Sequence, residues 1–138
     1  PLNHIKPHGA LYVMASTDEE MSRAIADAVE PFDVEIFGMA NTAHEKVYKN
    51  ERGLNFISEF YADLDYDKNG KLVLAKGKNS LYDSDLSTKR TLRAIKEKKV
   101  KTIDGSDIDV GCDTICVHSD TPNAVEIITK LKNAINEL

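Results

Sequence analysis

The stretch NHIKPHGALY, residues 3–12, places two histidines and a lysine around a proline and a glycine. Pro7 lacks an N–H and has a fixed φ, so it is typical of the end of a strand. Gly9 permits a tight turn or the close approach of a ligand to the backbone. We therefore expect Lys6 and His8 at the tip of a strand, where α/β proteins place their chemistry. The alternative is a basic turn on the surface.

The composition is that of a globular chain of ordinary size. Its 138 residues suit one domain over residues 1–138, and 41% of them are hydrophobic and 30% charged. The formal net charge is −5 and the lysines are scattered, so we expect neither a nucleic acid nor a membrane as partner. No apolar run approaches the roughly 20 residues that a membrane-spanning helix needs.

Two cysteines, Cys112 and Cys116, bear on the cellular compartment. On one extended strand they would lie about 13 Å apart, because each residue rises by about 3.3 Å. A disulfide needs Cα atoms within about 7 Å, so we predict free thiols. Free thiols are typical of the reducing cytoplasm, where we expect the protein to reside.

The hydrophobic pattern alternates between strands and helices. We expect strands over residues 1–6, 34–38, 56–60 and 114–117, and helices over residues 17–30, 42–49, 84–98 and from 120 to the end. This alternation predicts an α/β fold with a mainly parallel sheet. Four main strands are too few for a closed barrel, which usually has eight, so the sheet is either open or half of a barrel.

Local signals place the ends and faces of these elements. Thr17 and Glu20 form a capping box, Pro31 ends that helix, and Asp120 with Pro122 begins the last helix. Residues 114–117 form an apolar run that is typical of a strand buried on both faces. Inward apolar stripes are expected at Met21, Ile25, Ala28 and Val29, at Leu86, Leu92 and Ile95, and at Ala124, Ile128, Leu131, Ile135 and Leu138.

The segment between the third strand and the next helix carries turn signals. Residues 61–66 indicate an acidic loop, residues 67–70 a turn and residues 71–74 a further extended run. We expect a hairpin or another excursion over residues 61–74 and a loop over residues 75–83. Residues 65–70 also match the start of a calcium-binding EF-hand loop. Its twelfth position would be Lys76, where a glutamate is required, so we favour a plain turn.

Charged side chains follow three of the predicted strands. Because parallel strands end at one edge of a sheet, we expect these side chains to converge. Histidines, carboxylates and a lysine together suit proton transfer or a divalent metal, and the start of the last helix suits an oxyanion. The candidates are Lys6 and His8 on the first strand end, Glu59, Asp63 and Asp65 on the third, and His118 and Asp120 on the last.

Each candidate has a simpler interpretation. Asp120 could only cap the last helix, Lys6 and Glu59 could be solvated, and His118 could be a core histidine. His4 and His44 lack supporting neighbours in the sequence, so we interpret them as structural or surface residues. The sequence contains neither a Walker-type phosphate loop nor a GxSxG motif, so no motif indicates an ATP site within this chain.

Four ordered segments resemble the LamB/YcsF family, whose members form the A subunit of bacterial 5-oxoprolinase. The resemblance covers essentially the whole chain. Residues 4–12, HIKPHGALY, resemble the family's KPHGALY signature, and residues 37–42, FGMANT, resemble its GLAGS turn. Residues 59–72 resemble its EVFADRxYxxDGxL segment, and residues 116–122, CVHSDTP, resemble its CVHGDTP motif.

The resemblance implies a TIM-like β/α barrel of the glycoside hydrolase/deacetylase type. It also implies ATP-dependent opening of 5-oxoproline to glutamate together with B and C subunits, with ATP bound in the complex. On the matching positions, the family's site falls on Lys6, His8, Glu59, Asp63, His118 and Asp120. We assign acid–base chemistry to His118 and Asp120, with Lys6 and His8 also catalytic, and substrate binding to Glu59, Asp63 and Gly9.

Three departures from the family pattern qualify this expectation. The motifs DLNxDxGE, GFHAGD and HPS of the family's N-terminal half are absent, and the chain opens with Pro1, so we expect it to correspond to the C-terminal portion only. Leu64 stands where the family has arginine, and Ser119 stands where it has glycine. Half of a barrel leaves two open sheet edges, which invite the missing half or self-association.

Three functions are compatible with these features. The first is the C-terminal part of the 5-oxoprolinase A subunit. The second is a related hydrolase or deacetylase that acts on a carbohydrate or another amide, with help from a metal. The third is a non-catalytic binding or assembly module.

Overall fold

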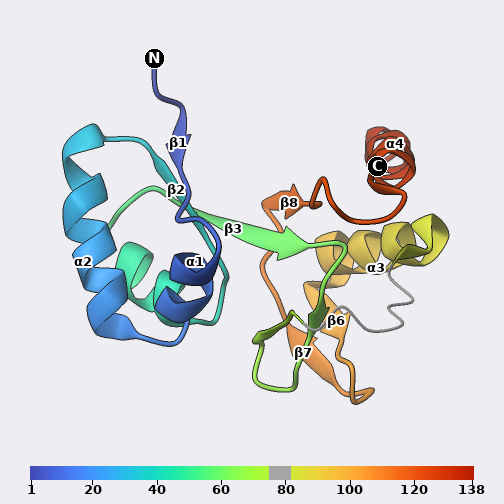
Figure 1. Cartoon of the computed structure of the whole chain (residues 1–138), viewed down its shortest axis with the longest axis horizontal. Coiled ribbons are helices and arrows are strands. Elements are labelled where there is room, and N and C mark those ends of the chain that lie inside the picture. Colours follow the sequence, from blue (N-terminus) through green and yellow to red (C-terminus); the bar gives the residue numbers. More distant parts are fainter. Residues whose placement is uncertain (75–81) are drawn as a thin grey trace. The chain divides into compact units, whose positions relative to one another are not determined.

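The computed structural model describes residues 1–74 and 82–138, and most of the loop predicted over residues 75–83 lies outside them. The chain divides into two compact units, Pro1–Glu59 and Phe60–Leu138. In Figure 1 the first unit runs from blue to green and the second from green to red. Both units combine strands with helices, which confirms the α/β class. That residues 1–138 form a single domain stays a prediction.

The first unit is built on short parallel strands. Strand β1 pairs with β2 through His4 and Glu35, and β2 pairs with β3 through Ile36 and Phe56. Both pairings are parallel, as the alternation of strands and helices predicts. The elements of this unit are β1 (His4–Ile5), α1 (Ala10–Ala15), α2 (Glu19–Val29), the 3₁₀ turn η1 (Glu30–Phe32), β2 (Glu35–Gly38), the π-helix η2 (Glu45–Glu51) and most of β3 (Phe56–Tyr61).

In its described residues, the second unit adds two hairpins, two helices and one further strand of the main sheet. The hairpins β4–β5 and β6–β7 are antiparallel, and the first confirms the hairpin predicted over residues 61–74. Strand β8 is the neighbour of β3, and beyond it Ala62 donates its N–H to the carbonyl of Cys116 at 3.1 Å. The elements are β4 (Asp65–Tyr66), β5 (Leu72–Val73), α3 (Ser84–Glu97), β6 (Lys99–Lys101), β7 (Asp107–Asp109), β8 (Thr114–Cys116) and α4 (Ala124–Asn136).

The core of the first unit joins α2 and η2 to the sheet. Helix α2 contributes Ala26 and Val29, η2 contributes Val47 and Tyr48, and β2 contributes Ile36. All five side chains are buried, so their removal from water stabilises this unit by about 1.5–3 kcal/mol for each large apolar side chain.

The core of the second unit places α4 against the end of the sheet. Ile127 and Leu131 of α4 pack with Ala62, which follows β3 directly. Ile115 and Val117, on and just after β8, pack against this cluster and are only partly buried. This packing holds β8 and the residue that follows it against α4.

Two helix starts differ from those predicted. Asp18, and not Thr17, caps α2, because its carboxylate accepts the N–H of Met21 at 3.0 Å. The last helix begins at Ala124 after Asn123, which has a left-handed φ of 61°, so Asp120 and Pro122 lie in the preceding turn. Asp120 therefore does not cap this helix.

The predicted apolar stripes are only partly correct. Ala28 is exposed, and the neighbouring Ala26 is buried in its place. Leu86, Ile128 and Leu138 are exposed as well, whereas Leu131 is buried as predicted and Leu92, Ile95, Ala124 and Ile135 are partly buried. Helix α3 buries its small residues Ser84, Ser87, Thr91 and Ala94, and α4 buries Ile127 and Leu131. Strand β8 is half-buried along its length, and so it is not buried on both faces as predicted.

The two cysteines are free thiols, as predicted from their spacing. Cys112 is buried, and burial raises the pKa of its thiol to about 11. This thiol is therefore protonated and unreactive at neutral pH. Within residues 1–74 and 82–138, none of the helices has the length and apolar character required to cross a membrane.

Candidate functional site

The end of β1 brings Lys6 into an ion pair with Glu59, near the end of β3. The Lys6 ammonium donates to the Glu59 carboxylate at 2.6 Å. The Glu59 side chain is 4% exposed and that of Lys6 is 28% exposed, so the carboxylate is the buried member. The Lys6 nitrogen also lies 5.5 Å from the centre of the Tyr12 ring. The ion pair and the ring hold the lysine at the strand tip, where the sequence predicts it.

The residues between β1 and α1 form a turn, as Pro7 and Gly9 predict. Gly9 precedes α1 with a φ of 58°, a conformation that favours glycine. His8 and Gly9 are exposed, whereas Pro7 is buried. The turn therefore presents His8 and the backbone of Gly9 to solvent.

The second unit brings Asp63 and His118 together. Asp63 is fully buried, and its carboxylate accepts the backbone N–H of His118 at 2.7 Å and the hydroxyl of Thr121 at 2.6 Å. The Nδ1 atom of His118 lies 3.0 and 3.1 Å from the two Asp63 oxygens. The imidazole stacks on the Tyr61 ring at 5.7 Å and stays 39% exposed.

This geometry determines the tautomer of His118. An ionised carboxylate only accepts hydrogen bonds, so Nδ1 carries the proton that it donates to Asp63. In the neutral imidazole, Nε2 then holds the lone pair and can accept a proton. A buried carboxylate, an oriented imidazole and partial exposure together make the arrangement of a general base with its orienting group.

Two further predicted site residues, Asp120 and Asp65, lie in other segments of the second unit. Asp120 is exposed in the turn at residues 119–120 and Asp65 lies in β4. The turn of the β4–β5 hairpin is closed by Asp67, whose carboxylate accepts the N–H groups of Asn69 and Lys71 at 2.8 and 2.9 Å. These contacts are those of a plain turn.

The structure thus forms two pairs from the predicted residues, Lys6 with Glu59 in the first unit and Asp63 with His118 in the second. That all of these residues serve one site stays a prediction. Two further residues were missed by the sequence analysis, Tyr12 beside Lys6 and Thr121 on Asp63. Tyr12 lies within the motif at residues 4–12 and Thr121 within the motif at residues 116–122. The resemblance of these motifs to the family was therefore the only indication of them in the sequence.

No group of three or more histidine, cysteine, aspartate or glutamate side chains in the described parts of the chain lies close enough to hold a metal ion. The Asp63–His118 pair offers two such groups, and Asp63 already accepts hydrogen bonds from Thr121 and from the His118 backbone. Within the described residues, these two groups are fewer than the three or four protein ligands of typical zinc sites.

His44 is a core residue, one of the two interpretations that the sequence left open. It is fully buried, and its Nδ1 accepts the N–H of Met39 at 3.2 Å. The ring lies edge-on to Tyr12 at 4.7 Å and stacks with Tyr48 at 5.2 Å. Burial lowers the pKa of His44 to about 4, so the ring is neutral at neutral pH.

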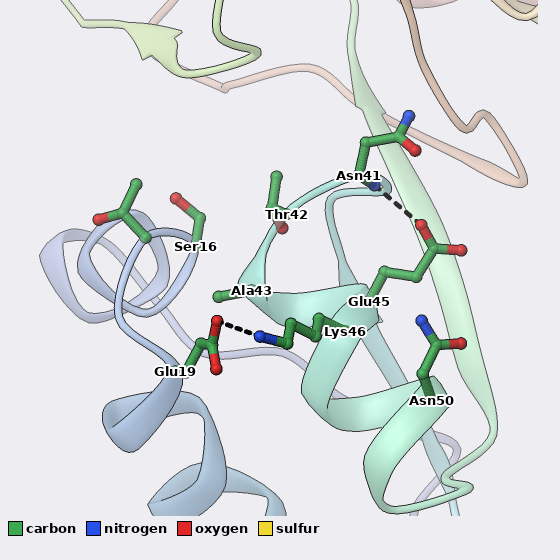
Figure 2. Close-up of a pocket in the computed structure, with 9 residues that line it drawn as sticks. Ser16, Glu19, Asn41, Thr42, Ala43, Glu45, Lys46 and Asn50 are labelled. Carbon is green, nitrogen blue, oxygen red and sulfur yellow. Dashed lines mark hydrogen bonds and ion pairs between the residues drawn. The ribbon is translucent and has the colours of Figure 1, made fainter.

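A polar pocket of about 570 Å³ lies within the first unit, beside the turn at residues 39–42. Figure 2 shows two interactions across its wall, in which Lys46 pairs with Glu19 at 2.5 Å and Glu45 accepts the N–H of Asn41 at 2.8 Å. Two of the charged groups that line it, Glu19 and Lys46, thus neutralise each other. Its lining residues are Ser16, Thr17, Glu19, Asn41, Thr42, Ala43, Glu45, Lys46 and Asn50, none of which the sequence predicts as a site residue.

An apolar groove of about 300 Å³ lies within the second unit, between β8 and α4. Ile115 and Val117 form one wall and Ile128, Leu131 and Ile135 form the other. Ile128 is 49% exposed there, so the groove presents an apolar side chain to solvent.

Comparisons with known proteins agree on one family. The family model described as "LamB/YcsF family" matches residues 1–138. The A subunit of 5-oxoprolinase from Campylobacter jejuni subsp. jejuni is 40% identical over 99% of this chain and 54% of its own length. Its counterpart of the same name from Oceanobacillus iheyensis is 39% identical over 97% of this chain and 53% of its own length.

A solved structure supports the same relationship. The crystal structure of a lactam utilization protein from Thermus thermophilus superposes with a TM-score of 0.84 at 34% identity. The match covers 99% of this chain and 55% of the other. The chain therefore spans about half the length of the relatives that it matches.

Proposed function

This chain belongs to the LamB/YcsF family, and from that premise we propose that it supplies the C-terminal portion of the 5-oxoprolinase A subunit. The proposed reaction is the hydrolytic opening of the lactam 5-oxoproline to glutamate, driven by ATP. The observation that carries the proposal is the bond from His118 Nδ1 to the buried Asp63, because it leaves Nε2 as a base at a half-exposed position.

We propose that His118 activates water. Its Nε2 takes a proton from the water whose oxygen adds to the lactam carbonyl carbon. The ring C–N bond then breaks, and the proton passes from His118 to the leaving nitrogen, which becomes the amine of glutamate. Asp63 keeps the imidazole oriented and stabilises the imidazolium that forms between the two steps.

Lys6 has the charge to stabilise the oxyanion that develops on the lactam oxygen. Its pairing with Glu59 at 2.6 Å and its place over Tyr12 hold the ammonium in one position, so little reorganisation is needed during the reaction. We assign His8 and the backbone of Gly9 to contacts with the substrate carboxylate, since both are exposed beside Lys6 in the chain. Asp120 is assigned to acid–base chemistry from its place in the CVHSDTP motif.

ATP is assigned to the complex and not to this chain. Lys6, which we assign to the oxyanion, already pairs with the Glu59 carboxylate at 2.6 Å, and this pairing does not suit it to a triphosphate. We propose that the B and C subunits supply the nucleotide site. The two free cysteines support a cytoplasmic location.

The groove between β8 and α4 is proposed to receive the rest of the family's β/α barrel. Strand β8 has β3 as its described neighbour in the sheet, and the groove beside it is lined by apolar side chains. The relatives are about twice as long as the matched region, which supports the proposal that their remaining portion complements this fold. A strand and helix of that portion would bury Ile128 and the open edge of β8.

The function is tested by reconstitution. The chain is combined with the complementary portion of the Campylobacter jejuni relative and with B and C subunits, and glutamate formed from 5-oxoproline and ATP is measured. We expect turnover, and its loss in His118→Ala and in Asp120→Asn without unfolding. Unchanged turnover in both variants would overturn the site, and no turnover from a correctly assembled wild type would favour a non-catalytic module.

The proposed role of the groove in association is tested by a separate experiment. Ile128→Asp places a charge in the groove, and Val125→Asp places one on the same helix at an 81% exposed position outside it. We expect the first variant alone to lose association with the complementary portion in analytical ultracentrifugation. Equal association of both variants, or a homodimer of the chain that excludes the complementary portion, contradicts the assignment.

A further inference from the structure

The Arg90 side chain on α3 binds the backbone of the segment that follows β3. Its Nη1 donates to the carbonyls of Tyr61 at 2.9 Å and Ala62 at 3.3 Å, and its Nη2 donates to the carbonyl of Leu64 at 2.8 Å. Ser87, one turn earlier on α3, donates its hydroxyl to the same Ala62 carbonyl at 2.9 Å. Two side chains of one helix therefore hold residues 61–64.

The guanidinium of Arg90 is enclosed by aromatic rings. It lies 5.1 Å from the centre of the Phe60 ring and 5.4 Å from that of Tyr66. Burial lowers the pKa of Arg90, and the nearby Tyr66, Asp65 and Asp63 counteract this. Taking a guanidinium out of water costs free energy, which the three carbonyls and the two rings offset. Only a planar fork of N–H groups can reach carbonyls in this pattern, so lysine is not equivalent.

The carbonyls that Arg90 binds lie on both sides of Asp63 in the chain. Tyr61 and Ala62 precede it and Leu64 follows it. Asp63 is fully buried, and it holds His118 through the backbone N–H and through Nδ1. The direction of the Asp63 carboxylate depends on the backbone that Arg90 fixes, so a loosened segment would misplace the imidazole.

We propose that Arg90 is a positioning residue that fixes the backbone around Asp63 and thereby holds His118 as its Nδ1–H tautomer. The catalytic part of this inference rests on the proposed function. Its structural part stands on the contacts of the second unit alone, and a measurement of the tautomer tests it without any turnover.

A second arginine on α3, Arg93, provides the control for Arg90. Arg93 lies one turn beyond Arg90, and its guanidinium pairs with the exposed carboxylates of Asp107 at 2.6 Å and Glu97 at 2.8 Å. Arg93→Lys therefore removes the same fork from the same helix without touching residues 61–64. A comparison of Arg90→Lys with Arg93→Lys separates positioning from the general loss of an arginine.

The experiment measures the ring nitrogens of His118 by ¹⁵N NMR of the full chain at pH about 8.5, where an ordinary imidazole is neutral. In the wild type and in Arg93→Lys we expect Nδ1 to have the shift of a protonated nitrogen and Nε2 that of an unprotonated one. In Arg90→Lys we expect intermediate shifts, because water-exposed imidazole favours the Nε2–H form. Ser87→Ala, which removes one of the four bonds, should shift the nitrogens in the same direction by less.

Activity is measured on the reconstituted complex. We expect kcat for Arg90→Lys to fall by about tenfold to a hundredfold with little change in KM, and Arg93→Lys to stay within about twofold of the wild type. A folded Arg90→Lys variant with wild-type ring shifts overturns the inference. Altered shifts with unchanged kcat refute the catalytic role of His118 instead, so the two failures are distinguishable. If Arg90→Lys does not fold, the ring shifts and kcat of Ser87→Ala test the inference by the same criteria.

Discussion

His44 in the first unit and His118 in the second both lie beside aromatic rings, but their polar surroundings differ. His44 is enclosed by Tyr12 and Tyr48 and is fully buried, and burial lowers its pKa to about 4. His118 stacks on Tyr61 on one side, is 39% exposed, and donates Nδ1–H to a buried carboxylate. Burial without a charged partner makes a histidine part of a core, whereas an orienting carboxylate and partial exposure make it a base.

The strongest test of this difference between the two histidines is to remove the negative charge of Asp63. Asp63→Asn keeps the size of the side chain but offers an amide N–H to the imidazole, which favours the wrong tautomer. We expect glutamate formation by the reconstituted complex to fall on the order of 10³–10⁴-fold, as such changes do in other base–carboxylate pairs. Asp85→Asn, an exposed carboxylate on α3, is the control and should leave the rate unchanged. Equal rates in both variants would contradict the role of Asp63.

The buried histidine should appear in the pH dependence of stability. The unfolded chain binds a proton at this residue below pH of about 6.5, whereas the folded chain does so only near 4. The contribution of His44 to the free energy of unfolding is thus fully present above pH 6.5. It falls by about 3 kcal/mol as the pH decreases towards 4. Denaturant titrations at pH 7 and pH 4 measure it.

His44→Asn serves as the reference for that measurement. Asparagine can still accept the N–H of Met39 but does not titrate. The free energy of unfolding should therefore change less with pH in His44→Asn than in the wild type. Parallel pH profiles for the two proteins would show that His44 is not buried as a neutral ring.

The space around His44 gives a further test of the first unit. A Cβ added at Gly38 would meet His44 Cβ at 2.8 Å and the Phe56 ring at 2.9 Å. Gly38→Ala should therefore destabilise the chain by about 1–3 kcal/mol in thermal or chemical unfolding. Ala28→Gly, at an exposed position of α2, costs about 1 kcal/mol through helix propensity alone and serves as a scale. A loss no larger than that of Ala28→Gly would show that the aromatic cluster is loosely packed.

The ion pair between Lys6 and Glu59 in the first unit gives a further test of stability. Lys6→Met removes the ion-pair partner of a carboxylate that is 4% exposed, and Glu59→Gln leaves a lysine that is 28% exposed. We expect a loss of about 2 kcal/mol for Lys6→Met and less for Glu59→Gln, because the buried charge is the costlier one to leave. The double variant should recover part of the loss. Additive losses in the double-mutant cycle would argue against direct coupling.

Much of the fold could be predicted because it depends on local patterns. The order of strands and helices, the end of α2 at Pro31 and the hairpin turn at residues 67–70 follow from apolar periodicity and turn residues. The helix starts were less predictable, because Thr17 and Asp18 are both good caps and only the backbone decides between them. The short helix α1 was missed, since its six residues carry no cap of their own.

Side-chain burial was harder to predict than the order of elements. Helix α3 packs through Ser87, Thr91 and Ala94 and leaves Leu86 exposed, because close helix contacts favour small residues there. The candidate site depended on motifs at strand ends, and these motifs placed both members of each pair. No sequence motif indicated Arg90, because it contacts backbone carbonyls that are far from it in the sequence.

The most direct measurement compares the two histidines in one assay. Glutamate formation from 5-oxoproline is measured with His118→Gln and with His44→Asn in the reconstituted complex, alongside thermal unfolding of each chain. The account predicts that His118→Gln keeps its unfolding temperature and loses about 10²–10⁴-fold in rate, while His44→Asn unfolds at lower temperature but keeps its rate when folded. A reversed pattern, with activity lost in folded His44→Asn and kept in His118→Gln, would contradict it.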